Sequence, residues 1–249
     1  MKLVNKTCLS LALAFGISHG AVAALITYTG SGGKGLVYSS VSNITWTQDA
    51  NLFDTLANSY AGGYSAFVSA VIDSVPEGRI YDTPNYLDTP NNSGYHSLSV
   101  NDFNYVNYGL NNWYGSKAFA IYLNSVSYGG SNQWRLPVIG SSPLGSELSQ
   151  LLYNEIDITG ISLPNIPIFN NFQGYSYWTG TEYESFPAFA FNFITLTNGH
   201  DLNLKNLNNN TWVVSEGYIS PVPEPESWVL MLSGLLGIAS VLRRKNHYS

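Results

Sequence analysis

The fold class follows from residues 177–193, YWTGTEYESFPAFAFNF. Two segments of this stretch, residues 177–180 and 188–193, have the bunched or alternating apolar residues that are typical of β-strands. In the second segment, Phe189, Phe191 and Phe193 alternate with smaller or polar residues, which predicts a strand with one strongly apolar face. Further along, residues 211–214 (TWVV) predict a third strand, so the C-terminal half is β-rich.

Upstream of this stretch, the sequence predicts two more strands and several short helices. Residues 35–38 and 44–47 have strand patterns with a turn at Ser42-Asn43, and residues 30–35 indicate a flexible segment before them. Apolar residues at helical spacing predict helices over residues 65–75 and 112–126, and a further helical stripe is formed by Leu144, Leu148, Leu151 and Leu152. Short helices followed by mostly antiparallel strands indicate an α+β fold in one domain, residues 25–220.

Residues 81–108 interrupt this pattern. They are rich in Asn, Ser, Tyr, Asp and Pro and show little periodicity. We interpret them as a long, mostly irregular insertion on the surface, and loops of this length are commonly functional or mobile.

Residues 1–23 have the pattern of a secretory signal peptide. Lys2 and Lys6 form the positive end, an apolar stretch follows from Cys8 to Ile17, and small residues lead to cleavage by signal peptidase after Ala23 or Ala24. The alternative, an uncleaved membrane anchor, needs about 20 apolar residues. The apolar run here ends well short of that, so we expect an exported, processed chain.

Removal of the signal peptide changes the chemistry open to the mature chain. Cys8 is the only cysteine, so disulfides, thiol catalysis, thiolate metal sites and lipoprotein acylation are excluded. Residues 25–220 contain five basic and fourteen acidic residues, which gives a net charge of -9. Such a surface argues against nucleic acid and anionic lipid as partners, since both need clustered Lys and Arg. A surface of Asn, Ser, Thr, Gly and Tyr suits hydrogen bonding to neutral polymers or sugar. The alternative interpretation, of equal weight, is that this composition is common in secreted bacterial proteins and indicates no ligand.

The C-terminal residues form a second targeting segment. Residues 221–226 (PVPEPE) are stiff because each proline fixes its own backbone. An apolar run at residues 228–242 predicts a helix of about 22 Å, and Arg243, Arg244 and Lys245 follow it directly. The positive-inside rule places these basic residues in the cytoplasm and the domain outside.

This tail resembles the PEP-CTERM sorting signal over residues 221–249. The resemblance rests on Pro223, Glu224 and Pro225, on the glycine-containing apolar run, and on the stop at Arg243 and Arg244. It implies that exosortase, a membrane-embedded cysteine transpeptidase of Gram-negative bacteria that make exopolysaccharide, removes the tail. The protein would be anchored transiently in the inner membrane and then reach the cell surface or extracellular matrix. The alternative is a simple C-terminal membrane anchor.

The mature domain resembles the Lcl C-terminal-like family, whose biochemical function is unknown. The resemblance implies a fold near the C-type-lectin-like and formylglycine-generating-enzyme-like domains. The sequence departs from the family at residues 211–216, which lack the usual arginine. The matching segments contain the following motif residues, which we interpret as structural: Trp46, Trp134, Arg135, Leu136, Pro137, Trp178, Gly180 and Glu182.

Arg135 has two interpretations within this motif. In the structural one, Trp134 and Leu136 are core residues on a strand, and Arg135 satisfies buried carbonyls or pairs with an acid such as Glu147. In the other, Arg135 holds a ligand carboxylate.

The fold neighbours suggest two chemistries. Formylglycine generation needs a cysteine pair that the mature chain lacks. Calcium-dependent sugar binding needs converging carboxylate and amide oxygens, for which the insertion offers Asp82, Asp88, Asn91, Asn92 and Asp102, although their spacing matches no known calcium loop. We therefore predict no metal, cofactor or catalytic residue.

For the function, the sequence favours a non-catalytic surface or matrix protein. It would bind exopolysaccharide or another surface glycan through exposed Tyr and Trp rings, or act as an inert structural component of a biofilm matrix. The alternative is a secreted carbohydrate-active enzyme that uses a carboxylate pair, with Glu182 and Glu184 as candidates.

Overall fold

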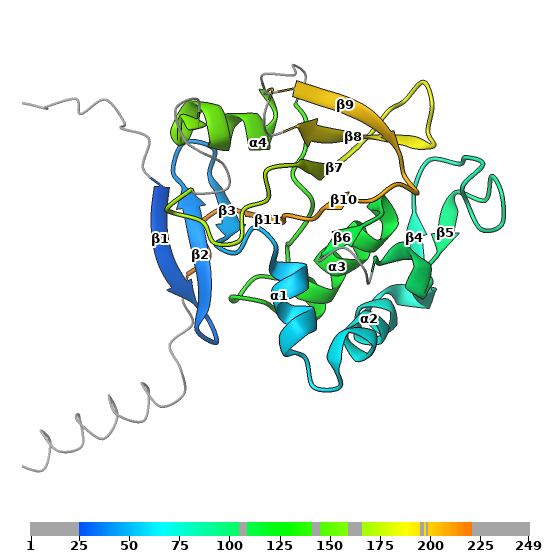
Figure 1. Ribbon diagram of the computed structural model, residues 1–249, viewed down its shortest axis with the longest axis horizontal. Helices are drawn as coiled ribbons and strands as arrows, with labels where there is room; N and C mark the ends of the chain where they lie inside the picture. The colour runs from blue at the N-terminus through cyan, green and yellow to red at the C-terminus, as the bar shows by residue number, and fades with distance from the viewer. Residues whose placement is uncertain are drawn as a thin grey trace, which may run out of the picture.

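A small antiparallel sheet holds the two ends of the domain together. The computed structural model describes residues 25–104, 109–140, 145–158, 166–194, 197 and 199–220. Strands β1 (Leu25–Gly30), β2 (Lys34–Ser39), β3 (Ile44–Thr47) and β11 (Val214–Glu216) form this sheet in the order β1-β2-β3-β11. Just beyond β11, the amide of Ile219 donates a hydrogen bond of 3.3 Å to the Tyr28 hydroxyl on β1. Both ends of the described domain therefore leave from the β1 side of the molecule (Figure 1).

β1 and β2 form a complete hairpin where the sequence predicted a flexible segment. All six residues of β1 pair with β2, from Leu25 opposite Ser39 to Gly30 opposite Lys34. Gly32 and Gly33 make the turn with φ angles of +66° and +72°, which glycine adopts without strain. The prediction for residues 30–35 is wrong because these glycines close a tight hairpin rather than loosening the chain.

A larger sheet forms most of the C-terminal half. Its strands run in the order β6-β10-β7-β8-β9: β6 (Leu110–Asn111), β10 (Asn209–Asn210), β7 (Ser176–Glu182), β8 (Phe189–Ile194) and β9 (Gly199–Leu204). All of its pairings are antiparallel except one parallel bridge between β10 and β7. The α+β class and the mostly antiparallel C-terminal half are confirmed.

Two details of the predicted strands are wrong. The stretch 211–214 is not one strand, because residues 211–213 connect β10 to β11. On β8, Ala190 and Asn192 are buried, whereas Phe189 and Phe191 on the expected apolar face are only half-buried. The phenylalanine face of β8 is thus only partly covered, and only Phe193 is fully buried on it.

Helices α1 (Leu52–Ser59), α2 (Gly63–Ser74) and α3 (Trp113–Ser125) pack together at one end of the molecule, whereas α4 (Glu147–Ser149), which runs into the π-helical segment η4 (Gln150–Glu155), lies beside the small sheet (Figure 1). The predicted helices over residues 65–75 and 112–126 are confirmed as α2 and α3. α3 begins at Asn112, whose side chain accepts a hydrogen bond of 2.9 Å from the Gly115 amide. In the third predicted stripe, Leu148, Leu151 and Leu152 are buried, and Leu144 lies outside the described residues.

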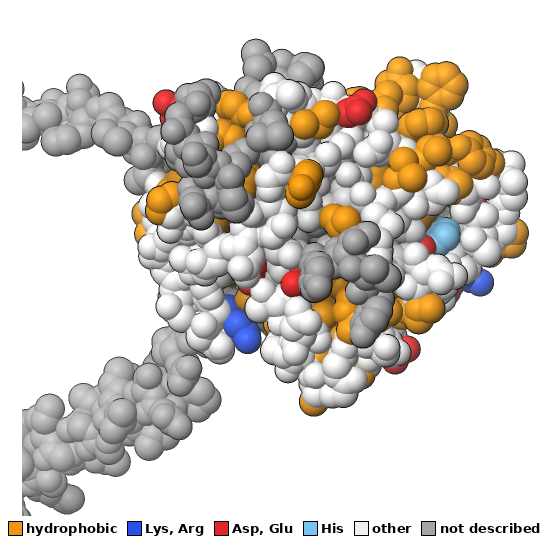
Figure 2. Space-filling view, viewed as in Figure 1, with side chains coloured by type: hydrophobic (Ala, Val, Ile, Leu, Met, Phe, Trp, Pro, Cys, Tyr) orange, Lys and Arg blue, Asp and Glu red, His pale blue; other side chains and the backbone are white. Residues whose placement is uncertain are grey.

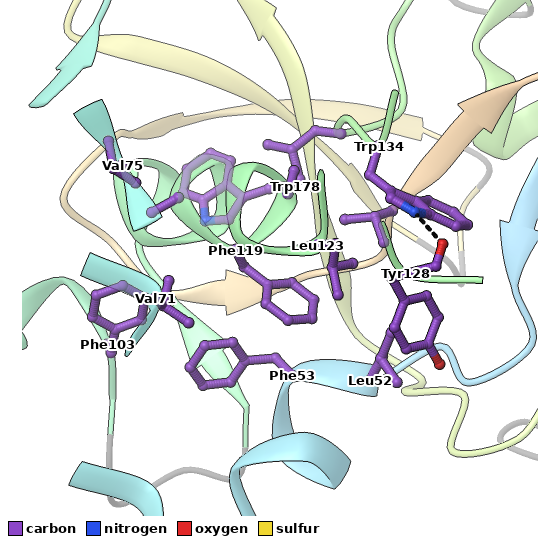
Figure 3. Close-up of a cluster of buried hydrophobic side chains, with 14 of the residues drawn as sticks. Leu52, Phe53, Val71, Val75, Phe103, Phe119, Leu123, Tyr128, Trp134 and Trp178 are labelled. Carbon is purple, nitrogen blue, oxygen red and sulfur yellow. Dashed lines mark hydrogen bonds between the residues drawn. The ribbon is translucent and has the colours of Figure 1, made fainter. Parts of the chain in front are cut away.

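One hydrophobic core joins α1, α2 and α3 to the sheets. Figure 3 shows Phe103 and Val71 at one end of this core and Tyr128 and Trp134 at the other. The rings of Phe53 and Phe103 stack at 5.7 Å, so Phe103 ties its loop to α1. A second core lies between the two sheets and the α4–η4 segment, with Trp46 and Trp212 packed together at 4.8 Å.

The predicted irregular insertion has more structure than expected. β4 (Arg79–Tyr81), which follows the short 3₁₀-helix η1 (Pro76–Gly78), pairs with β5 (Tyr95–Ser97), and the 3₁₀-helix η2 (Val100–Asp102) comes next. Residues 82–94 between the two strands contain neither helix nor strand, and residues 105–108 lie outside the described residues. The described part of the insertion is therefore a hairpin with a long loop.

Within the described residues, no helix is long and apolar enough to span a bilayer. The predicted signal peptide at residues 1–23, with Ala23 and Ala24, and the predicted tail helix at residues 228–242 lie outside the described residues.

Candidate functional site

A pocket of about 460 Å³ lies between α2, η2 and the loop before β10. This volume falls in the range of small-molecule sites in proteins. None of the described residues that line it is charged. They are Tyr64, Ser65, Val68, Val100, Asn101, Phe103, Asn104 and Asn208.

The chemistry of the pocket differs between its buried and exposed walls. Val68 and Phe103 are 2% and 4% exposed, so they offer apolar surface at depth. Ser65, Asn101 and Asn208 are exposed, so they place a hydroxyl and two amide groups at the rim. Amides and hydroxyls both donate and accept hydrogen bonds. Such a lining can bind an uncharged ligand that carries many hydroxyl groups.

Tyr64 adds a polar aromatic ring to this lining. Burial, helped by the nearby Asp54 carboxylate, raises the pKa of Tyr64 to about 12. The phenol therefore stays protonated at neutral pH. Its ring packs edge to face on Phe53 at 6.1 Å, which fixes it against the core.

Local capping holds η2 in place beside the pocket. Ser99 and Asp102 form a capping box, in which the Ser99 amide donates a hydrogen bond of 2.7 Å to Asp102 Oδ2. The other oxygen of Asp102 accepts hydrogen bonds from His96 Nε2 (2.9 Å) and Asn112 Nδ2 (2.7 Å). Asp102 thus links the insertion to the start of α3 and positions Asn101 at the rim.

The predicted glycan contact through exposed Tyr and Trp is wrong in its tryptophan part. All five tryptophans of the described domain are at most 3% exposed: Trp46, Trp113, Trp134, Trp178 and Trp212. Four of them donate their indole N–H to backbone carbonyls of other segments at 2.9–3.0 Å. They serve as packing residues, because a buried indole needs such a partner.

Exposed aromatic rings do occur on the loop between β7 and β8. Phe186 is 62% exposed and stacks on Tyr183 at 5.9 Å, and Tyr183 meets Phe191 at 5.7 Å. Figure 2 shows hydrophobic side chains gathered over this part of the surface, whereas basic side chains are sparse and isolated. This aromatic ridge, Tyr183, Phe186, Phe189 and Phe191, is a second surface that a polymer can contact.

A buried ion cluster lies behind the insertion. The side chains of Lys205 and Asp82 are both 0% exposed, and Lys205 Nζ lies 2.5 Å from Asp82 Oδ2. Lys205 Nζ also donates to Glu182 Oε2 at 2.8 Å. Glu182 in turn accepts from the Thr83 amide at 3.1 Å, so the cluster fixes the insertion to the ends of β7 and β9.

The two carboxylates of this cluster respond to it in opposite directions. Burial raises the pKa of Asp82, and hydrogen bonding and charge attraction to Lys205 only partly oppose it. Burial also acts to raise the pKa of Glu182, but the hydrogen bond and charge of Lys205 outweigh it and the pKa of Glu182 is lowered. Lys205 lies over the Trp113 ring at 4.5 Å from its centroid, which adds a cation–π contact.

The motif residues of the family resemblance come together in two places. Gly180 donates its amide to the Pro137 carbonyl at 2.8 Å, so the segment 134–137 lies beside the segment 178–182. Trp134, Leu136 and Trp178 are buried in the first core, whereas Trp46 belongs to the second. Trp134 and Leu136 are core residues as predicted, but their segment is not a strand, since only a single bridge joins Arg135 to Val214.

The predicted pairing of Arg135 with Glu147 is confirmed. Arg135 Nη1 and Nη2 donate to the two oxygens of Glu147, each at 2.8 Å. The hydrogen bond to Glu147 raises the pKa of Arg135 further, against the effect of burial. The Val138 amide donates to the same carboxylate at 2.8 Å, so Glu147 ties two segments together.

The other candidate groups do not converge. Glu182 binds Lys205, whereas Glu184 is exposed on the loop after β7. The three aspartates proposed as calcium ligands are each engaged by protein groups. Asp82 binds Lys205. Asp88 accepts hydrogen bonds from Asn85 and Gly94, and Asp102 accepts them from His96 and Asn112. Asn91 and Asn92 are exposed. Among the described residues, no group of three His, Asp or Glu side chains is arranged to hold a metal ion.

Sequence reasoning missed both the pocket and Lys205. The pocket is built from three segments that show no shared pattern. A signal for Lys205 did exist: it is one of only five basic residues between residues 25 and 220, and it directly follows the β9 segment.

The C-terminal tail matches a known family. The residues matched by the family model are 221–245, and its description is the PEP-CTERM protein-sorting motif. The chain carries a PEP-CTERM motif. This motif indicates an exported protein that exosortase handles at the membrane, as the tail predicted. No curated protein and no solved structure matches the chain. The motif residues Pro223, Glu224, Pro225, Arg243 and Arg244 lie outside the described residues.

Proposed function

We propose that the domain of residues 25–220 is a non-catalytic binding module for a neutral glycan at the cell surface or in the extracellular matrix. The observation that carries this proposal is the uncharged pocket of about 460 Å³ with amide and hydroxyl groups at its rim and aromatic surface below. Exopolysaccharide of the producing bacterium is the ligand class that fits both this lining and the PEP-CTERM tail.

The position of the pocket supports this role. The ends of the described domain leave beside β1, whereas α2 lies toward the opposite end of the molecule (Figure 1). A chain attached through the C-terminal end of this domain would therefore present the pocket away from the point of attachment. A polymer outside the cell can then reach it.

The acidic charge of the domain narrows the glycan class. A net charge of -9 between residues 25 and 220 repels polysaccharides rich in uronate or sulfate. The described pocket lining supplies no basic side chain to offset this repulsion. A neutral hexose polymer is therefore the preferred ligand.

The enzyme alternative needs two carboxylates that face each other across a substrate. Asp82 and Glu182 are the paired carboxylates here, but Asp82 is 0% exposed and both bind the same lysine. We therefore favour binding over hydrolysis.

Co-sedimentation with insoluble polysaccharide tests the proposal. The processed protein, purified from its host, is mixed with the host exopolysaccharide, with a neutral glucan and with an acidic uronate polymer. The proposal expects saturable binding to the neutral polymers that weakens little with salt, since charge does not drive it. Binding to none of them at high micromolar concentration overturns it.

A further inference from the structure

The cluster of Lys205, Asp82 and Glu182 has the composition of a reactive centre as well as that of an ion pair. Lys205 Nζ lies 2.5 Å from Asp82 Oδ2, short for an N–H···O contact. Both side chains are 0% exposed, and Glu182 Oε2 lies 2.8 Å from the same nitrogen. An amine and a carboxyl group are thus held together away from water, and a second, partly exposed carboxylate lies against the same nitrogen.

The hydrogen bonds on Asp82 are distributed unevenly. Oδ2 accepts from Asn85 Nδ2 (3.0 Å) and Tyr114 Oη (3.2 Å) in addition to Lys205. Oδ1 is buried and has no hydrogen-bond partner among the described residues. Donors fixed on one oxygen stabilise the charge that develops there when a nucleophile attacks the carboxyl carbon. The other oxygen is the one that is free to leave.

The surroundings keep water away from the reacting pair. The Lys205 ammonium lies over the rings of Trp113 (4.5 Å) and Tyr114 (5.8 Å), which exclude water. An amide can form only from an uncharged amine and a carboxylic acid, and a proton passed from the Lys205 ammonium to Asp82 supplies both. Burial raises the pKa of Asp82 while Glu182 stays ionised, as a proton acceptor must.

We propose that Lys205 and Asp82 condense into an intramolecular isopeptide bond, with Glu182 as the proton carrier. The Nζ amine attacks Cγ of the protonated Asp82, and charge collects on Oδ2, held by Asn85 and Tyr114. Glu182 takes one proton from the nitrogen and delivers it to the Oδ1 hydroxyl. Water leaves, Oδ2 becomes the amide carbonyl, and Glu182 is regenerated. One C–N bond forms and one C–O bond breaks, with no oxidant or reductant.

Such a bond would serve the exported chain. Asp82 and Lys205 are 123 residues apart, so the link closes most of the domain into one covalent loop. Crosslinks of this kind restrict the unfolded chain, the role that disulfides play in many secreted proteins. The mature chain has no cysteine with which to form one. This inference does not depend on the proposed glycan binding.

Mass spectrometry of the folded, processed protein tests the proposal. The intact mass is expected to be about 18 Da, one water, below that of the unlinked chain. Trypsin should then fail to cleave after Lys205, and residues 80–117 should appear joined to the peptide that starts at Leu136. Lys117→Arg is the matched control, because Lys117 also lies over Trp113, at 4.3 Å, but its Nζ donates to the Tyr81 carbonyl. It should keep the mass loss.

Two variants separate the chemistry from folding. Lys205→Arg keeps the charge but cannot form the amide, so its mass should equal the mass calculated for its own sequence, with no loss of water. Glu182→Gln keeps the shape but removes the proton carrier, so the folded variant should stay mostly unlinked. A folded wild-type protein with the full unlinked mass and normal cleavage after Lys205 overturns the proposal. Complete linkage in Glu182→Gln overturns the role of Glu182.

Discussion

Arg135 and Glu147 lie face to face, joined by two parallel hydrogen bonds of 2.8 Å. This fork geometry is specific to arginine, because the lysine ammonium is a point charge without a planar pair of donors. Arg135→Lys should therefore lower the free energy of unfolding by about 1–2 kcal/mol, since charge-assisted hydrogen bonds to a partly buried carboxylate are lost. For a domain of this size, that corresponds to a fall in Tm of about 3–6 °C, measured by differential scanning calorimetry.

The same substitution at Arg79 is the control. Arg79 donates to Glu77 at 2.8 Å, but this pair is exposed on the insertion hairpin. Exposed ion pairs contribute little to stability, so Arg79→Lys should leave Tm essentially unchanged. An unchanged Tm in Arg135→Lys would instead support the interpretation that Arg135 holds a ligand.

The two buried tryptophans Trp46 and Trp178 differ in one hydrogen bond. Both are 0% exposed, but Trp178 Nε1 donates to the Asn111 carbonyl at 3.0 Å, whereas Trp46 Nε1 has no partner among the described residues. Replacement of either by Phe removes similar volume, and only Trp178→Phe also removes a buried hydrogen bond, the one to the Asn111 carbonyl. We expect Trp178→Phe to cost about 1–2 kcal/mol more than Trp46→Phe in urea unfolding. Equal costs would show that the hydrogen bond contributes nothing.

His96 should make the stability depend on pH. Burial disfavours its charged form, but the hydrogen bond and charge of Asp102 outweigh burial and raise the pKa of His96 above its ordinary value of 6.5. Its contribution is therefore complete below pH 6.5 and is lost as the pH rises through the folded pKa. In the wild type, Tm should therefore fall as the pH rises above 6.5. In His96→Gln this fall should be absent when Tm is measured between pH 5.5 and 8.5.

His200 provides a control of opposite sign. Burial lowers the pKa of His200, and neither of its ring nitrogens has a hydrogen-bond partner among the described residues. Its contribution is complete above pH 6.5 and is lost as the pH falls from 6.5 through the lowered folded pKa. His200→Asn should thus flatten the acid side of the profile and leave the decline above neutral pH. If the two variants had the same effect, the assignment of the neutral-pH decline to His96 would be incorrect.

The tail makes a prediction that is independent of the fold. Because the PEP-CTERM motif spans residues 221–245, the protein from its host should end near the Pro223–Pro225 segment, as read by mass spectrometry. In a host that lacks exosortase, the chain should keep the apolar run and Arg243. A tail retained in both hosts would favour the simple membrane anchor.

The sequence predicted the elements whose pattern is local and strong. Helices α2 and α3 have clear apolar periodicity. The Arg135–Glu147 pair could be predicted because the domain has so few basic residues. β1 was missed because most of its side chains are exposed or half-buried, so no strongly apolar face marks it in the sequence. The Lys205–Asp82 contact joins residues 123 apart, and the pocket combines three segments. No local pattern specifies such contacts, because they depend on how the whole chain folds.

A pair of variants tests most directly whether the uncharged pocket binds a neutral glycan. Asn101 and Asn208 are exposed at the rim, so Asn101→Ala combined with Asn208→Ala should leave Tm unchanged. Phe186→Ala, on the aromatic ridge, is the matched surface control. The measurement is the Kd for the host's neutral exopolysaccharide by isothermal titration calorimetry. We predict that the double variant binds at least about tenfold more weakly, whereas Phe186→Ala binds like the wild type. Wild-type affinity in the double variant, with binding lost in Phe186→Ala, would contradict the pocket and assign the glycan to the aromatic ridge.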